Sequence, residues 1–211
     1  MGRIYFRRQG RQPFFAARHP RFRVKRVDAL PRLRFVRLNA VPDKPDRPRP
    51  EKFRPCVACL LVNAEGKLLI CERRDFANSW QFPQGGRDFG ETPREALARE
   101  VWEELSLEPQ TYDVTEERGG YRYRFPQRHR RRGKYVGQQQ IYFRCRFHSS
   151  DSLINLETKQ PEFRSFRWIE PREFDLRWLP DFKRAVYARV LLDFFGIEQP
   201  EGFESIPVED V

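Results

Sequence analysis

The sequence lacks the features that would place it in a membrane or on a secretory route. No apolar run in its 211 residues approaches the ~20 residues needed to cross a bilayer, and no signal-peptide pattern opens the chain. Cysteine is scarce, with four residues: Cys56, Cys59, Cys71 and Cys145. We therefore expect a soluble, cytoplasmic protein whose thiols are reduced, because disulfides are rare where signal peptides are absent.

A structural zinc site is also not expected. Cys56 and Cys59 have a C-x-x-C spacing, but no second Cys or His pair at ligand spacing follows them. Both cysteines lie inside an apolar run that reads as a strand. We interpret them as buried thiols rather than metal ligands.

Serine and threonine are absent from residues 1–50, and Met1 is the only methionine in the chain. These 50 residues carry 13 Arg and 2 Lys against 3 Asp, a net charge of +12, which leaves the rest of the chain at −1. Three interpretations stay open: a basic arm that binds RNA phosphates, an organelle transit segment, or a start extended upstream of an initiator near Val41. The absence of Ser and Thr argues against a transit segment.

From Arg54 onward the pattern is that of alternating strands and turns. The apolar runs CVACLLV (56–62) and KLLICER (67–73) flank the turn sequence NAEG, which predicts a β-hairpin. Residues 138–147 and 164–170 are further strand candidates. Apolar residues four apart, from Phe182 to Phe194, predict a helix over about 181–195.

The stretch from Trp80 to Leu107 concentrates acidic residues in a basic chain. Thr92, Pro93 and Glu95 have the chemistry of a helix start. On that helix the carboxylates of Glu100, Glu103 and Glu104 fall within roughly a 100° arc, and the adjacent arc is apolar: Leu97, Val101, Leu105. Three carboxylates on one face repel one another unless cations lie between them, and oxygen ligands favour Mg²⁺ or Mn²⁺. On spacing alone, a solvated face with Arg–Glu pairs is an equal alternative.

The residues around these glutamates form a longer pattern: Gly85, Glu91, Arg99-Glu100-Val101, Glu103-Glu104 and Ser106-Leu107. The pattern resembles the Nudix box and meets eight of its nine specified positions. The departure is Ser106, where the family has glycine. Because that glycine ends the helix in a left-handed conformation, we expect Ser106 to cost about 1 kcal/mol or to shift the turn.

The resemblance extends from about Phe53 to Phe195, through segments such as RRDFANSWQFPQGG, VGQQQIYF and DFKRAVYARV. These segments look like bacterial RNA pyrophosphohydrolases and the related asymmetric diadenosine tetraphosphate hydrolases. The resemblance implies an α/β fold, an α/β/α sandwich around a mixed sheet. We accordingly divide the chain into a disordered basic N-terminal extension (1–51), a Nudix hydrolase domain (52–196) and an acidic tail (197–211).

The resemblance also implies roles for particular residues. Glu100, Glu103 and Glu104 would bind two or more Mg²⁺ or Mn²⁺ ions, with the Gly85 carbonyl as a further ligand. Glu162 matches a family glutamate that acts as ligand or base, so Glu103, Glu104 and Glu162 are the catalytic candidates. The positions that would hold phosphates and the first nucleotides are Arg54, Arg74, Ser79, Tyr123, Phe182 and Lys183. The sequence leaves open whether Glu103 or Glu162 is the base.

Three functions follow, in order of preference. The first is removal of pyrophosphate from 5′-triphosphorylated RNA, which would prime mRNA decay. The second is hydrolysis of dinucleoside polyphosphates, and the third is a catalytically silent module that binds RNA or a nucleotide. Basic residues from Arg118 to Lys134, interleaved with Tyr121, Tyr123, Phe125 and Tyr135, favour RNA, although a solvated hairpin with ordinary strand aromatics would read the same. We expect a monomer that binds neither membrane nor DNA.

Overall fold

The computed structural model describes residues 51–127 and 134–198. The basic extension apart from Glu51, the acidic tail from residue 199 and the run of arginines within 128–133 lie outside the described residues. Within the described ranges no helix is long and apolar enough to span a membrane.

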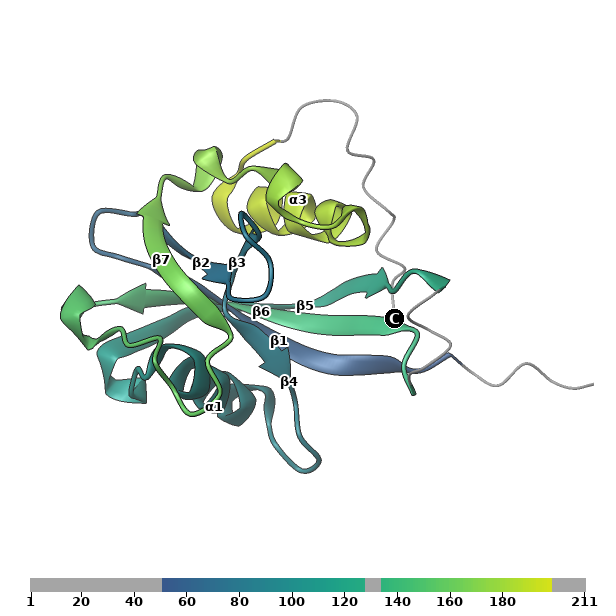
Figure 1. The fold of residues 1–211 in the computed structure, drawn as a ribbon, viewed down its shortest axis with the longest axis horizontal. Helices are drawn as coiled ribbons and strands as arrows, with labels where there is room; N and C mark the ends of the chain where they lie inside the picture. The colour runs from purple at the N-terminus through teal and green to yellow at the C-terminus, as the bar shows by residue number, and fades with distance from the viewer. Residues whose placement is uncertain (1–50, 128–133, 199–211) are drawn as a thin grey trace, which may run out of the picture. The chain divides into compact units, whose positions relative to one another are not determined.

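A mixed sheet forms the centre of the described unit (Figure 1). Its path runs β3-β2-β1-β6-β5, with β4 paired to β1 and β7 paired to β2. The strands are β1 Phe53–Val62, β2 Leu68–Arg73, β3 Trp80–Gln81, β4 Gln84–Gly86, β5 Tyr112–Arg124, β6 Gly137–Phe147 and β7 Phe163–Ile169. The β1–β6 pair is parallel and the other pairs are antiparallel.

The predicted hairpin is present as β1 and β2. The turn closes through hydrogen bonds from the Asn63 backbone N–H to the Lys67 carbonyl (3.0 Å) and from the Gly66 N–H to the Asn63 carbonyl (3.0 Å). The Asn63 side chain also accepts from the backbone N–H groups of Glu65 and Lys67. Asparagine at the start of the turn thus satisfies donors that the strands leave unpaired.

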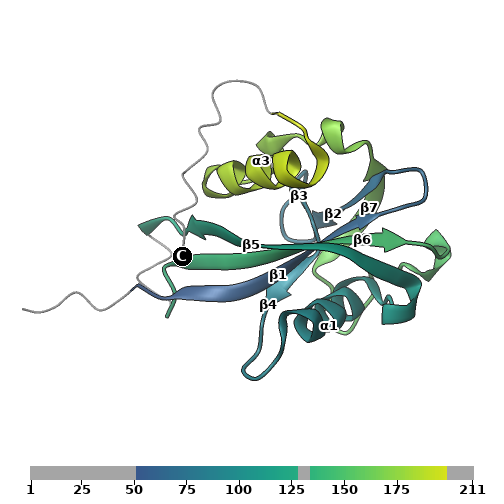
Figure 2. The same ribbon diagram turned by 180° about the vertical axis from the view of Figure 1, so that it is seen from behind.

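Two helices cover opposite faces of the sheet (Figures 1 and 2). They are α1, Pro93–Leu105, and α3, Asp181–Phe195. Alternate residues of β1 point to the two sides, so Leu60 belongs to the buried cluster under α3 and Leu61 to the cluster under α1. This arrangement confirms the expected α/β/α sandwich around a mixed sheet.

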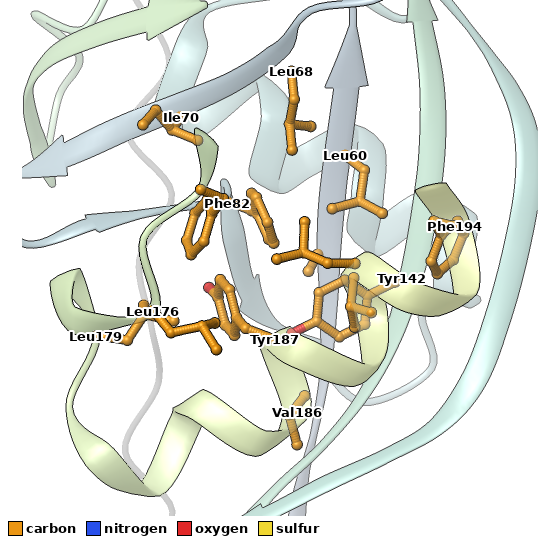
Figure 3. Packing of buried hydrophobic residues seen from close by; sticks show 14 of the residues in the cluster. Leu60, Leu68, Ile70, Phe82, Tyr142, Leu176, Leu179, Val186, Tyr187 and Phe194 are labelled. Carbon is orange, nitrogen blue, oxygen red and sulfur yellow. The ribbon is translucent and has the colours of Figure 1, made fainter. Parts of the chain in front are cut away.

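The core beneath α3 is rich in aromatic rings (Figure 3). Phe82 stacks on Tyr187 with ring centroids 4.7 Å apart, and Tyr142 meets Tyr187 edge-on at 6.4 Å. Val186 and Phe194 are buried as the helical period predicted. Large rings on both sheet and helix fix the position of α3, because each buries a large apolar area.

Helix α1 begins and ends where its sequence indicated, and its C-cap residue Ser106 has a strained backbone conformation. Thr92 and Glu95 form a capping box, in which the Thr92 hydroxyl accepts from the Glu95 N–H and Glu95 accepts from the Thr92 N–H. Such a cap contributes about 1 kcal/mol. Ser106 takes the left-handed conformation (φ 59°, ψ 25°) that the family glycine would adopt more easily. Its hydroxyl donates to the Asn155 carbonyl at 3.1 Å, which offsets part of the strain.

All four cysteines are free and buried, as expected. Burial raises the pKa of Cys56 to about 11 and the pKa of Cys71 well above its ordinary value. These thiols therefore stay protonated at neutral pH and suit packing rather than zinc binding.

Candidate functional site

Strand β4 and helix α1 meet where Gly85 lies against Glu100. A Cβ at Gly85 would overlap the carboxylate of Glu100. Only glycine therefore lets Glu100 lie directly against the strand. The side chain of Glu100 is 13% exposed, and burial raises its pKa.

Arg99 holds this junction together. Its Nε and Nη2 donate to the two carboxylate oxygens of Glu91 at 2.7 and 3.0 Å, and Nη2 also donates to the Gly86 carbonyl at 2.7 Å. Its Nη1 donates to Glu100 at 2.8 Å and to Glu103 at 3.1 Å. The Arg–Glu pairing considered from the sequence therefore exists, and it orients two of the three helix carboxylates.

The third carboxylate, Glu104, is buried behind the junction. One of its oxygens, Oε2, accepts from the Gln84 backbone N–H at 2.9 Å. The other, Oε1, is buried and has no hydrogen-bond partner among the residues described. Burial, followed by the nearby charges of Glu162 and Glu100, raises the pKa of Glu104 well above its ordinary value. The charge of Arg73 partly opposes this rise, but no described cation is hydrogen-bonded to the carboxylate, so an anion here needs a further cation.

A polar cleft of about 360 Å³ opens beside this junction. It brings together six of the predicted site residues: Arg54, Gly85, Glu100, Glu103, Glu162 and Lys183. Glu103 and Glu162 present half-exposed carboxylates to the cleft, at 56% and 53% exposure. The residues come from β1, β4, α1, the loop before β7, and α3, so the fold assembles the cleft from distant segments.

Lys183 is a partly buried cation of the cleft. Its Nζ donates to Gln81 Oε1 at 3.3 Å and lies 5.8 Å from the centre of the Tyr123 ring. Burial, and then the charge of Arg73, lowers the pKa of Lys183 to about 8. An anion bound in the cleft would compensate both effects, because it restores a charge partner to the ammonium.

Four predicted binding residues do not line the cleft. Arg74 donates to Glu157 at 2.7 Å. The backbone carbonyl of Ser79 accepts from the Arg73 N–H at 2.9 Å. Tyr123 is only 3% exposed and donates to Gln138 at 2.5 Å. The half-buried Phe182 packs on Tyr123 with centroids 5.6 Å apart. Their assignment to substrate binding stays a prediction.

The cleft also contains residues that the sequence analysis missed. Arg73 faces it between Glu162 (3.9 Å) and Asp75 (3.4 Å), and its buried Nε has no partner among the described residues. Gln84 and Gln138 line it as well, and Gln140, fully buried, donates to Gln84 at 2.7 Å. A signal was present: three consecutive glutamines lead directly into the apolar run Ile141–Phe143, and a glutamine buried there needs polar partners inside the fold.

The interleaved aromatics of β5 are not a stacking surface. Tyr121 and Tyr123 are each 3% exposed and pack in the cluster under α3. The alternation of the strand sends their rings inward and leaves Arg122 and Arg124 on the opposite face. For these two tyrosines the structure supports ordinary strand aromatics, so the argument for RNA that rested on their rings was wrong.

The donor set suits a hard divalent cation. Within the described residues no three His, Cys, Asp or Glu side chains are already gathered closely enough to hold an ion. The unpartnered buried Oε1 of Glu104, beside Glu100 and Glu162, is nevertheless an oxygen that lacks a cation. Oxygen ligands of this type fit Mg²⁺ or Mn²⁺.

Fold and site together define a class of protein. In this class an α/β/α sandwich carries a helix that lies against a glycine and whose carboxylates face cations across a cleft. Comparison with known families is consistent with this class. The chain belongs to the Nudix family, since the NUDIX domain matches residues 52–190. Nudix hydrolases generally use divalent metal ions such as Mg²⁺ or Mn²⁺.

Two relatives at 40% identity are both named RNA pyrophosphohydrolase. The chain is 40% identical over 144 residues to the RNA pyrophosphohydrolase of Roseobacter denitrificans, covering 66% of this chain and 89% of that protein. It is 40% identical over 146 residues to the RNA pyrophosphohydrolase of Psychrobacter cryohalolentis, covering 66% and 82%. Among solved structures, the MutT protein of Methanosarcina mazei Go1 is similar at 19% identity and a TM-score of 0.47, covering 66% of this chain and 94% of that one.

Proposed function

We propose that this protein is a metal-dependent Nudix hydrolase that removes pyrophosphate from the 5′-triphosphate end of RNA. The observation that carries the proposal is the cleft, in which Arg54, Arg73 and Lys183 face Glu100, Glu103 and Glu162. Cations can hold a polyphosphate while the carboxylates hold the ions that neutralise it. The similarity to RNA pyrophosphohydrolases at 40% identity supports RNA as the substrate.

The residues divide the work in the following way. Glu100, Glu103 and Glu104, with the Gly85 carbonyl, would hold two or more divalent ions, which when bound neutralise phosphate oxygens and activate water. Lys183 and Arg54 bind the anionic phosphates and orient them. The proton of the attacking water passes to a carboxylate that is open to the cleft, either Glu103 or Glu162. Glu104 is buried, so it would serve as a metal ligand rather than as the base.

Hydrolysis of dinucleoside polyphosphates is the second candidate. Burial of Tyr121 and Tyr123 removes rings that favoured RNA, and the cations of the cleft serve either substrate. A catalytically silent module is disfavoured, because every predicted carboxylate is present and Glu100 and Glu103 are held in orientation by Arg99.

The decisive experiment compares turnover of a 5′-triphosphorylated oligoribonucleotide and of diadenosine tetraphosphate with Mg²⁺ on one preparation. RNA should be turned over with the higher kcat/KM. Glu103→Gln and Glu104→Gln should each lower turnover by orders of magnitude with the fold intact. The control is Glu108→Gln, an exposed residue outside the cleft. Near-normal activity in both Glu103→Gln and Glu104→Gln would contradict the metal assignment, and faster turnover of the dinucleotide would favour the second candidate.

A further inference from the structure

One end of the sheet extends beyond helix α1. Figures 1 and 2 show β1, β5 and β6 running past the helix on that side. The buried cluster under α1 reaches Val57 on β1 and the partly buried Ile141 on β6, and it includes no residue nearer the start of either strand. The side chains that follow on this face are Phe53, Pro55, Arg122, Arg124 and Gln139. No described helix covers this face, which we call the Phe53 platform.

The register of the strands explains how the platform is built. Phe53, Gly137 and Arg124 pair across β1, β6 and β5, and a Cβ at Gly137 would lie 2.9 Å from Phe53 Cε1. The missing side chain at Gly137 lets the Phe53 ring lie across β6. The guanidinium carbons of Arg122 and Arg124 are 5.4 and 5.6 Å from the ring centre. Both are within the range of a cation–π contact.

The cations of the platform are only lightly neutralised. Arg122 donates through Nη2 to Gln139 at 3.2 Å, which is a neutral partner, and its Nε has no acceptor among the residues described. Arg124 pairs with Glu51, but both side chains are about half exposed. Exposed ion pairs contribute little, so a phosphate can replace Glu51 at low cost.

The platform is continuous with the cleft around the edge of β1. Arg54 and Gln138 line the cleft, and they are the chain neighbours of Phe53 and Gly137 on the other face of the sheet. Strand β4 pairs with β1 from Cys56 onward, and the Arg87 N–H still donates to the Pro55 carbonyl at 3.0 Å, so among the described residues the edge is unpaired only over Phe53 and Arg54. A chain leaving the cleft can therefore pass over this edge onto the platform.

We propose that the Phe53 platform binds the single-stranded RNA that follows the 5′-terminal nucleotides held in the cleft. This inference rests on the proposed function. Guanidinium groups bind RNA phosphates, and rings and guanidinium planes both stack unpaired bases. An acidic protein segment would use the cations alone, whereas the combination of ring and cations at the cleft edge fits RNA.

The experiment varies RNA length. Phe53→Leu keeps apolar contact with Gly137 but removes the ring, and Arg122→Gln removes the charge. Each should raise KM about fivefold or more for a triphosphorylated RNA of roughly ten nucleotides and change it less than about twofold for a triphosphorylated dinucleotide. Arg122→Gln should also reduce the salt slope of binding by about one. The matched control is Arg146→Gln, an exposed arginine at the other end of the β5–β6 ladder.

A second measurement does not depend on catalysis: anisotropy of a labelled ten-nucleotide RNA with a 5′-monophosphate. Weaker binding by both platform variants, with Arg146→Gln unchanged, supports the platform. Equal losses for long and short RNA, or binding equal to the parent protein, overturn it. A parent protein that hydrolyses neither RNA would contradict the proposed function, while the anisotropy result would still decide whether the platform binds RNA.

Discussion

Replacing Glu91 by Gln tests the junction that orients the catalytic helix. Glu91 accepts two hydrogen bonds from Arg99 and one from the Asp88 N–H at 2.9 Å. The pairing with Arg99, the largest cause, lowers the pKa of Glu91 from 4.5 to about 2. That difference corresponds to roughly 3 kcal/mol at about 1.4 kcal/mol for each pH unit. Because the side chain is 21% exposed, solvent screens part of it, and we expect the variant to lose about 2 kcal/mol at pH 7.

The stability difference between the parent protein and Glu91→Gln should depend on pH. A carboxyl whose pKa is lower in the folded state stabilises the fold above its unfolded value, here 4.5, and loses that effect as the pH falls toward 2. The gap between parent and Glu91→Gln should therefore be full at pH 7 and shrink below about pH 4.5.

Urea unfolding followed by tryptophan fluorescence at several pH values between 3 and 7 measures this gap. Glu65→Gln, which removes an exposed pair with Lys67, is the control and should behave like the parent. Equal stability of Glu91→Gln and parent at pH 7 would refute the reasoning. A gap that does not change with pH would mean that packing, not charge, is lost.

Three further predictions concern other parts of the chain. Gly85→Ala should lower turnover at least about 100-fold by displacing Glu100, whereas Gly119→Ala, whose Cβ would meet only Ile141 Cγ1 at 3.6 Å, should be near normal in a steady-state assay. Ser106→Gly should relieve the left-handed strain and raise the free energy of unfolding by about 0.5 kcal/mol, and a lower melting temperature would contradict this. Deleting residues 1–48 should leave a folded, active enzyme with weaker binding to long RNA at low salt, since every described strand and helix begins at Phe53 or later. A truncated protein that cannot fold would refute that boundary.

The sequence predicted the elements whose periodicity is long enough to recognise. The hairpin of β1 and β2, the capped helix α1 and the helix α3 all follow from local patterns of charge and apolarity. Strands β3 and β4 span two and three residues, and no period exists over that length. Their extended form depends on pairing with β2 and β1, which lie apart in the chain.

The sequence predicted the parts of the site whose residues lie close together in the chain. Glu100 and Glu103 share a face because of helix geometry, and both reach the cleft. The burial of Glu104 depends on β4, which no helical pattern reveals. The alternation of β5 indicates two faces but not which one is buried, so the sequence could not show that Tyr121 and Tyr123 pack in the cluster under α3.

The parallel pairing of β1 with β6 also sets when the protein can become active. It joins Phe53–Val62 to Gly137–Arg146. Lys183, the predicted cleft residue nearest the C-terminus, is synthesised later still. Contacts so distant in sequence form late, because loop closure must precede them. During synthesis, the tyrosines and leucines on the face of the sheet that α3 covers should stay exposed until α3 leaves the ribosome. We therefore expect catalytic competence and protection from aggregation to arrive in the same step, the docking of α3.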